Sequence, residues 1–100
     1  MALIRIASTG ELPPGKLLQA EANGRLLAVC NDAGVIHAFD DSCPHHGGPL
    51  AQGNFVDGCI VCTWHAWEFN VERGEMAYNP EIRLRRFPVT VSGEDVFVEI

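Results

Sequence analysis

A chain of 100 residues has the length of one domain, and its composition, 47% hydrophobic and 20% charged, is that of a folded protein. Seven basic residues against thirteen acidic ones give a formal net charge of −6, which argues against a nucleic-acid ligand, whose phosphates need a basic patch, and favours a partner with a positively charged face. We therefore expect a single domain over residues 1–100, monomeric and without a nucleic-acid ligand.

The first residues have neither the basic start nor the apolar stretch of a signal peptide. No segment approaches the roughly 18 apolar residues of a membrane span. We therefore expect a cytoplasmic protein with no membrane partner. In a reducing compartment, the four cysteines, at positions 30, 43, 59 and 62, favour metal ligation over disulfides.

Short apolar segments separated by turn residues follow one another along the chain. The segments with strand character are 3–7, 16–22, 25–31, 35–39 and 59–62. Asn23-Gly24 lies between two of them and predicts a two-residue hairpin, because both positions of that turn favour positive φ. The frequent turns leave little room for a long helix.

Residues 59–73 contain neither glycine nor proline, and this alone would permit a helix. However, Trp67, Phe69 and Val71 alternate there with polar residues, which favours a strand.

The C-terminal segment shows the clearest alternation. Phe87, Val89 and Val91 alternate with less apolar residues, and after a turn the same pattern continues at 96, 98 and 100. This predicts a terminal hairpin with one buried face. The whole pattern is that of an all-β antiparallel sandwich or small barrel, with a compositionally unusual insertion at about residues 42–80.

The insertion carries two short motifs that each combine a cysteine with a histidine. The first runs from Cys43 to His45, the second from Cys62 to His65, and sixteen residues lie between them. Each motif offers one thiolate and one imidazole, and the Asp57-Gly58 turn can bring the two motifs face to face. Four such ligands suit two tetrahedral irons that share two sulfides.

These motifs and their spacing resemble the Rieske family, in particular its low-potential soluble [2Fe-2S] ferredoxins that serve oxygenases, and the resemblance covers nearly the whole chain. It implies the Rieske β-sandwich with an inserted cluster-binding subdomain. It also implies that Cys43 and Cys62 bind the inner iron, and that His45 and His65 bind the outer, solvent-near one. Two neutral imidazoles in place of thiolates raise the reduction potential relative to an all-cysteine cluster.

The resemblance implies further contacts around the cluster. Gly47 and Gly48 would let backbone N–H groups approach the cluster sulfurs, since no Cβ stands in the way. Prolines at 49 and 80 would stiffen the covering loops. His46 is expected beside the cluster or at the surface rather than as a ligand. Trp64 and Trp67 are expected to shield the cluster or to line the docking surface.

High-potential members of the family differ from this chain at four of these positions. They carry a disulfide where this chain has Gly48 and Trp64, and hydroxyl donors where it has Trp67 and Phe69. Because the loss of hydroxyl donors destabilises the reduced, more negative state, we expect a potential near the low end of the Rieske range, roughly −150 mV.

Other uses of these residues remain open at this point. A structural zinc site also accepts two thiolates and two imidazoles. Cys59 forms a Cys-x-x-Cys pair with Cys62, but it falls in an apolar strand with no helix after it. Cys30 and His37 are expected to be strand residues rather than ligands. The basic run at 83–86 is expected to be a solvated strand face, with contact to an acidic partner as the alternative.

The function that the resemblance implies is one-electron transport without a substrate of its own, so the chain is not expected to be an enzyme. Electrons would pass from a flavin-containing NAD(P)H reductase to a terminal oxygenase, either an aromatic-ring dioxygenase or a diiron monooxygenase. The alternatives are a small Rieske-like subunit of a nitrite reductase-type complex and a zinc-stabilised binding module.

Overall fold

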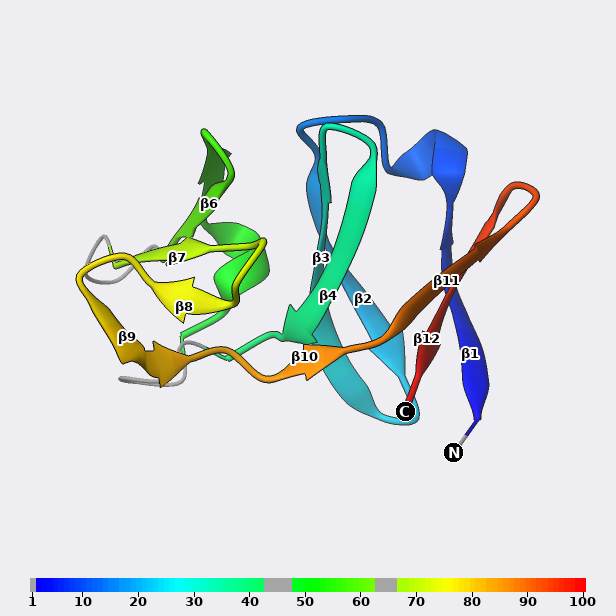
Figure 1. Cartoon of the computed structure of the whole chain (residues 1–100). Helices are drawn as coiled ribbons and strands as arrows, with labels where there is room; N and C mark the ends of the chain where they lie inside the picture. Colours follow the sequence, from blue (N-terminus) through cyan, green and yellow to red (C-terminus); the bar gives the residue numbers. More distant parts are fainter. Residues whose placement is uncertain (1, 43–47, 63–66) are drawn as a thin grey trace.

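The computed structural model describes residues 2–42, 48–62 and 67–100 (Figure 1). Its regular elements are short strands and two 3-10 helices. In chain order they are β1 (Leu3–Ser8), η1 (Thr9–Glu11), β2 (Leu17–Ala22), β3 (Arg25–Asp32), β4 (Val35–Asp40), η2 (Leu50–Gln52), β5 (Asn54–Val56), β6 (Cys59–Val61), β7 (Glu68–Asn70), β8 (Glu75–Met76), β9 (Asn79–Arg83), β10 (Arg86–Phe87), β11 (Val89–Ser92) and β12 (Asp95–Glu99).

Within the described ranges the strands form three antiparallel sheets. Their orders are β1-β12-β11, β10-β4-β3-β2 and β5-β6-β7-β8-β9, and we call them the first, middle and third sheets. The third sheet lies to one side of the other two in Figure 1. None of the described helices is long and apolar enough to cross a membrane. The prediction of an all-β antiparallel fold is confirmed.

The tight turns form where the sequence predicts them. Asn23 and Gly24 have φ of 53° and 76°, and they join β2 to β3 with Ala22 opposite Arg25. The Asp57-Gly58 turn joins β5 to β6 in the same way, with φ of 50° and 76°. Two positive φ values in succession twist the chain in the sense that a two-stranded ribbon requires.

Residues 59–73 contain strands, as the alternation predicts. β6 and β7 are antiparallel, with Ile60 opposite Phe69. Both of these side chains are fully buried, as is Val71. The described part of this segment contains no helix.

The C-terminal hairpin is only partly as predicted. β11 and β12 pair, and Val96 and Val98 are completely buried, but Val91 is 49% exposed. Val91 lies opposite Val96 and so shares its face, yet β11 is the edge strand of the first sheet. Phe87 belongs to β10 in the middle sheet instead of continuing β11. The prediction of one continuous buried face is therefore wrong at Val91.

The middle sheet is buried on both faces. Leu27 and Val29 pack in the core next to the first sheet, whereas Ala28 and Cys30 pack in the core next to the third sheet. Five consecutive residues of β3 are buried because alternate side chains enter different cores. Cys30 lies in β3 and is fully buried, so its predicted place in a strand is confirmed. Burial raises the pKa of its thiol to about 12.

Arg86 links the third sheet to the middle sheet. Its guanidinium group donates hydrogen bonds to the carbonyl oxygens of Val71 and Glu72, and it lies 2.7 Å from Nδ1 of His37. The same group stands 4.8 Å from the ring centroid of Phe39. Arg86 belongs to the basic run that is expected to be a solvated strand face, and the residue is exposed, but its Nη2 is bonded to the turn that follows β7.

His37 has to be uncharged in this arrangement. A guanidinium group has no acceptor, so Nδ1 of His37 accepts the hydrogen bond and the ring proton lies on Nε2. Burial, and then the charge of Arg86, lower the pKa of His37 below its ordinary value of 6.5, while Asp32 and Glu72 act in the opposite direction. The Arg86–His37 hydrogen bond, which lies within the middle sheet and positions Arg86, therefore requires a neutral imidazole.

We expect the His37–Arg86 contact to make the fold sensitive to acid. Because the folded-state pKa of His37 is lowered, its contribution to stability is present above the unfolded pKa of about 6.5 and declines as the pH falls below it. His37→Gln should lose less stability between pH 7.5 and pH 5.5 than the unmodified protein, since a glutamine oxygen can accept from Arg86 without titrating. Urea midpoints followed by circular dichroism measure this, and equal losses in the two proteins would contradict it.

Candidate metal centre

One of the four predicted ligands, Cys62, lies within the described residues. The other three, and three of the residues expected around them, lie outside: Cys43, His45 and His65, with His46, Gly47 and Trp64. The described ranges contain no group of three or more histidine, cysteine or acidic side chains able to hold a metal ion. The structure therefore describes this site through the residues that flank the two segments carrying the predicted ligands, and we call these flanking residues the stems.

Cys62 ends the strand stem of the second segment. It follows β6 directly, is 2% exposed and packs in the core between the middle and third sheets. Its backbone N–H donates to the carbonyl oxygen of Trp67 at 2.8 Å, and this hydrogen bond joins the two ends of the second segment. The Cys62 sulfur is therefore shielded from water.

Asp41 closes the first segment, which runs from 42 to 50. Its Oδ1 accepts a hydrogen bond from the backbone N–H of Ala51 at 2.7 Å, and its Oδ2 accepts one from Nε2 of Gln19 at 2.6 Å. Its own N–H donates to the carbonyl oxygen of Leu26. Asp41, which is 8% exposed, thus joins both ends of this segment to β2 through its carboxylate and to β3 through its backbone N–H. Sequence reasoning missed Asp41, whose only local signal is an acidic residue at the end of an apolar strand.

The two stems meet at Gly53. A Cβ added there would lie 2.0 Å from the carbonyl oxygen of Val61, the residue before Cys62, and 3.2 Å from that of Leu50. Only glycine permits this approach of one backbone to another. Gly53 directly follows η2, which ends the first stem, so the first segment is packed against the start of the second. Sequence reasoning missed this residue also.

The residues expected around the site are placed as follows. Gly48 is buried and Pro49 half-buried. Trp67 is half-buried and lies 6.5 Å from the fully buried ring of Phe69, measured between ring centroids. Pro80 is exposed on β9. The assignment of these residues to a cluster stays a prediction.

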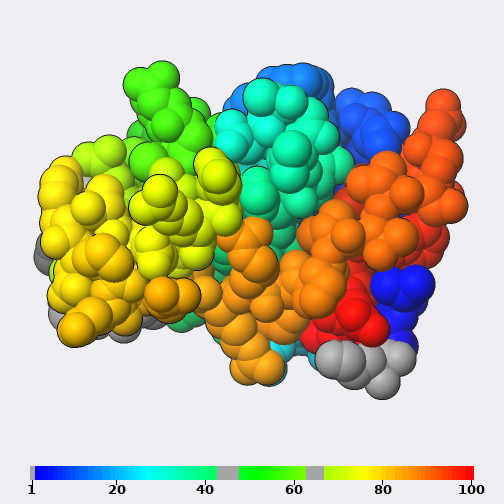
Figure 2. Space-filling view, in the orientation of Figure 1, coloured from blue at the N-terminus to red at the C-terminus, as the bar shows by residue number. Residues whose placement is uncertain are grey.

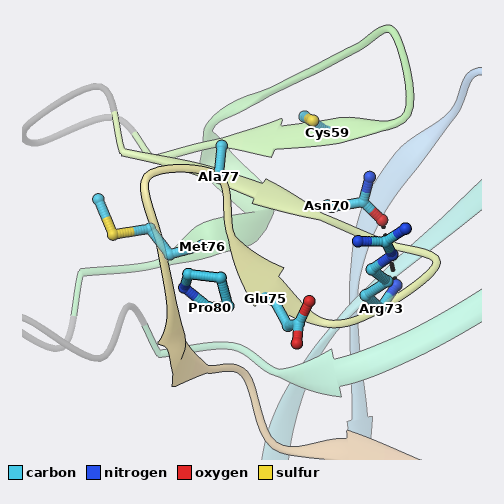
Figure 3. Close-up of a pocket in the computed structure, with 7 residues that line it drawn as sticks. All are labelled: Cys59, Asn70, Arg73, Glu75, Met76, Ala77 and Pro80. Carbon is cyan, nitrogen blue, oxygen red and sulfur yellow. Dashed lines mark hydrogen bonds between the residues drawn. The ribbon is translucent and has the colours of Figure 1, made fainter.

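Cys59 lies apart from Cys62, in a hollow of about 230 Å³ on the third sheet (Figure 3). Met76 and Pro80 line the same hollow. Burial, and then the charge of Glu68, raise the pKa of the Cys59 thiol. A raised pKa keeps this thiol neutral, which does not suit the reactive member of a redox dithiol.

Comparison with known proteins gives one family over most of the chain. The model of the Rieske [2Fe-2S] domain matches residues 2–88. The ferredoxin component of biphenyl 2,3-dioxygenase from Rhodococcus jostii is 37% identical, over 100% of this chain and 94% of that protein. The biphenyl dioxygenase ferredoxin subunit of a Pseudomonas species is 32% identical, over 99% and 93%.

A solved structure agrees with this match. A chain of the complex of reduced oxygenase and oxidized ferredoxin in carbazole 1,9a-dioxygenase superimposes with a TM-score of 0.86 and 28% identity. The alignment covers 96% of this chain and 91% of that one.

We expect Gly53→Ala to abolish stable binding of the metal group. The added methyl would overlap the carbonyl oxygen of Val61 and would have to displace one of the two stems, at a cost of about 1–3 kcal/mol or more. Iron and acid-labile sulfide per chain, measured after anaerobic reconstitution, should fall sharply.

The matched control is Gly10→Ala, whose Cβ would meet only Oγ of Ser8, at 3.9 Å. It should bind as much iron and sulfide as the unmodified protein. Full iron content in the Gly53 variant would show that the stems tolerate separation.

Proposed function

The chain belongs to the Rieske [2Fe-2S] family, and from this premise we propose that it is a ferredoxin, a one-electron carrier that delivers electrons to a terminal oxygenase and has no substrate of its own. The observation that carries this proposal is the full-length match: a single Rieske unit accounts for nearly all of both this chain and the ferredoxin component of a biphenyl dioxygenase. The carbazole dioxygenase complex, in which a ferredoxin binds its oxygenase, supports the same kind of partner.

The four ligands that we propose are Cys43, Cys62, His45 and His65. When bound, the [2Fe-2S] cluster supplies a centre that gains and loses one electron. In this assignment the two thiolates hold the inner iron and the two imidazoles hold the outer one. The buried thiol of Cys62, and the contact between the two stems at Gly53, support a group shared by the two segments.

Residues near the ligands favour a low potential. Phe69 is fully buried and has no hydroxyl group, so it cannot stabilise a reduced centre by donating a hydrogen bond. The imidazoles of His45 and His65 each keep one nitrogen free to carry a proton when the other binds iron. We therefore infer that reduction is coupled to proton uptake at these two rings in alkaline solution.

The electron donor in this proposal is a flavin-containing NAD(P)H reductase, because a carrier has to be reduced by one protein before it can reduce another. The net charge of −6 favours weak contacts that respond to salt, as suits a carrier that binds two proteins in turn. We propose further that the carrier acts as a cytoplasmic monomer. We also propose that it serves an aromatic-ring dioxygenase rather than a diiron monooxygenase, since two biphenyl dioxygenase ferredoxins match at 37% and 32% identity over 94% and 93% of their length.

A redox titration followed by electron paramagnetic resonance tests this function. The purified protein should show the signal of a histidine-ligated [2Fe-2S] cluster, with a midpoint of roughly −150 mV that falls at alkaline pH as the imidazoles lose their protons. A metal-loaded protein without such a signal would favour the alternative of a zinc-stabilised binding module. A midpoint that stays flat up to strongly basic pH would show that His45 and His65 are not ligands.

Two cysteine variants form the matched pair for this titration. Cys62→Ser should lose the signal, because it removes a proposed ligand. Cys59→Ser should keep it, because this thiol lies in the separate hollow on the third sheet. Loss of the signal in both would place Cys59 at the cluster.

A further inference from the structure

Three of the seven basic residues of this acidic chain line one groove of about 360 Å³. They are Arg25 at the start of β3, Arg85 just before β10, and Arg86. Phe87 forms part of the groove, and Glu99 of β12 lies on its wall. Figure 2 shows the segment around β10 at the lower edge of the molecule, beside the end of β12. Arg85 and Arg86 are exposed, as expected of the basic run, and with Arg25 they form a cluster of positive charge.

Two of the three guanidinium groups are held against one aromatic ring. The Cζ atoms of Arg25 and Arg85 lie 5.6 and 5.3 Å from the ring centroid of Phe87, which is 6% exposed and therefore fixed in the core. A cation–π contact uses the face of a guanidinium group and leaves N–H groups on its edge free to donate. The ring thus orders two forked donors at the surface.

These donors are incompletely paired. Within the part of the chain that the structure describes, Arg85 forms no ion pair with an acidic side chain. Arg25 makes one long contact, 3.3 Å to Oδ2 of Asp40, and both of these side chains are about a third exposed, at 39% and 32%. An exposed pair of this kind is weak and exchanges readily for another carboxylate. Arg86 is already bonded to the turn after β7, so it adds charge but few free donors.

The groove is joined to the stem of the first ligand-bearing segment. The N–H of Asp40 donates to the carbonyl oxygen of Arg85 at 2.9 Å, and the N–H of Asp41 donates to that of Leu26 at 3.1 Å. Asp41 is the residue that closes this segment at Ala51. A protein bound at Arg25 and Arg85 would therefore lie next to the stem that carries Cys43 and His45.

We propose that this groove is a docking surface for an acidic segment of a protein partner, whose carboxylates bind Arg25 and Arg85. The proposal rests on the proposed function, because a carrier has to hold its partner beside the loops that bind its cluster. Bidentate pairing of guanidinium with carboxylate supplies the recognition, and Glu99 on the wall restricts the approach of the acidic segment. Outside the groove the chain has four basic and twelve acidic residues, a balance that repels such a segment, so the groove sets the orientation in which this partner binds.

A capped hexaglutamate peptide is the probe for this surface. It is titrated into the holoprotein at low salt and followed by calorimetry. Arg25→Gln/Arg85→Gln should weaken binding by about tenfold or more, since both forked donors are lost.

The control is Arg5→Gln/Arg83→Gln, which also removes two positive charges. These charges belong to the surface ion pairs with Asp95 and Glu75, outside the groove. It should weaken binding by less than about threefold, because exposed pairs contribute little.

Three results would overturn the docking surface. Equal losses in the two double variants would show a general effect of net charge. Displacement of the peptide by equimolar inorganic phosphate would show a site for small anions. Absence of peptide binding to the unmodified holoprotein would show that the groove is not a docking surface for acidic segments. The redox titration of the same samples separates these results from failure of the proposed function, which a missing cluster signal in the unmodified protein would indicate.

Discussion

The two segments that carry the predicted ligands are brought together by the close contact of their stems. The backbone at Gly53 approaches the carbonyl oxygen of Val61 so closely that any side chain would prevent it. Asp41 ties the other end of the first segment to the middle sheet through Ala51 and Gln19. Both stems are fixed by hydrogen bonds and core packing, and the Asp41 and Gln19 side chains that take part are bonded to each other. Such support lets short loops present ligands to a shared cluster at a constant distance.

This arrangement depends in turn on a middle sheet with two buried faces. One face packs against the first sheet through Leu27 and Val29, and the other against the third sheet through Ala28 and Cys30. Arg86 adds a polar link across the second of these contacts, and its partner His37 is uncharged. The third sheet is thus held by apolar packing and by the hydrogen bonds that Arg86 donates to the carbonyl oxygens of Val71 and Glu72.

The arginines divide between structure and recognition in a way that the net charge of −6 conceals. Arg86 donates hydrogen bonds to backbone carbonyls and to His37, whereas Arg25 and Arg85 lie over Phe87, and of these two only Arg25 has an ion-pair partner among the described residues, Asp40 at 3.3 Å. A carrier that must bind two different proteins benefits from surfaces of opposite charge, because each surface then repels the wrong partner. Weak, salt-sensitive contacts at both surfaces are compatible with rapid exchange of partners.

The sequence by itself determined those features that depend on neighbours in the chain. The strands at 3–7, 16–22, 25–31 and 35–39 were predicted within a residue or two of their ends, because alternation and turn residues act locally. The cysteine–histidine motifs are equally local, and their spacing led to the family. Tertiary structure alone decided the rest: that Val91 would be exposed, that Gly53 would touch Val61, that Asp41 would close a loop, and that Arg25 and Arg85 would meet over Phe87. Arg25 meets Phe87 from a distant part of the chain, the other contacts join nearer residues, and all of them depend on how the sheets pack and where each sheet ends, which no local pattern encodes.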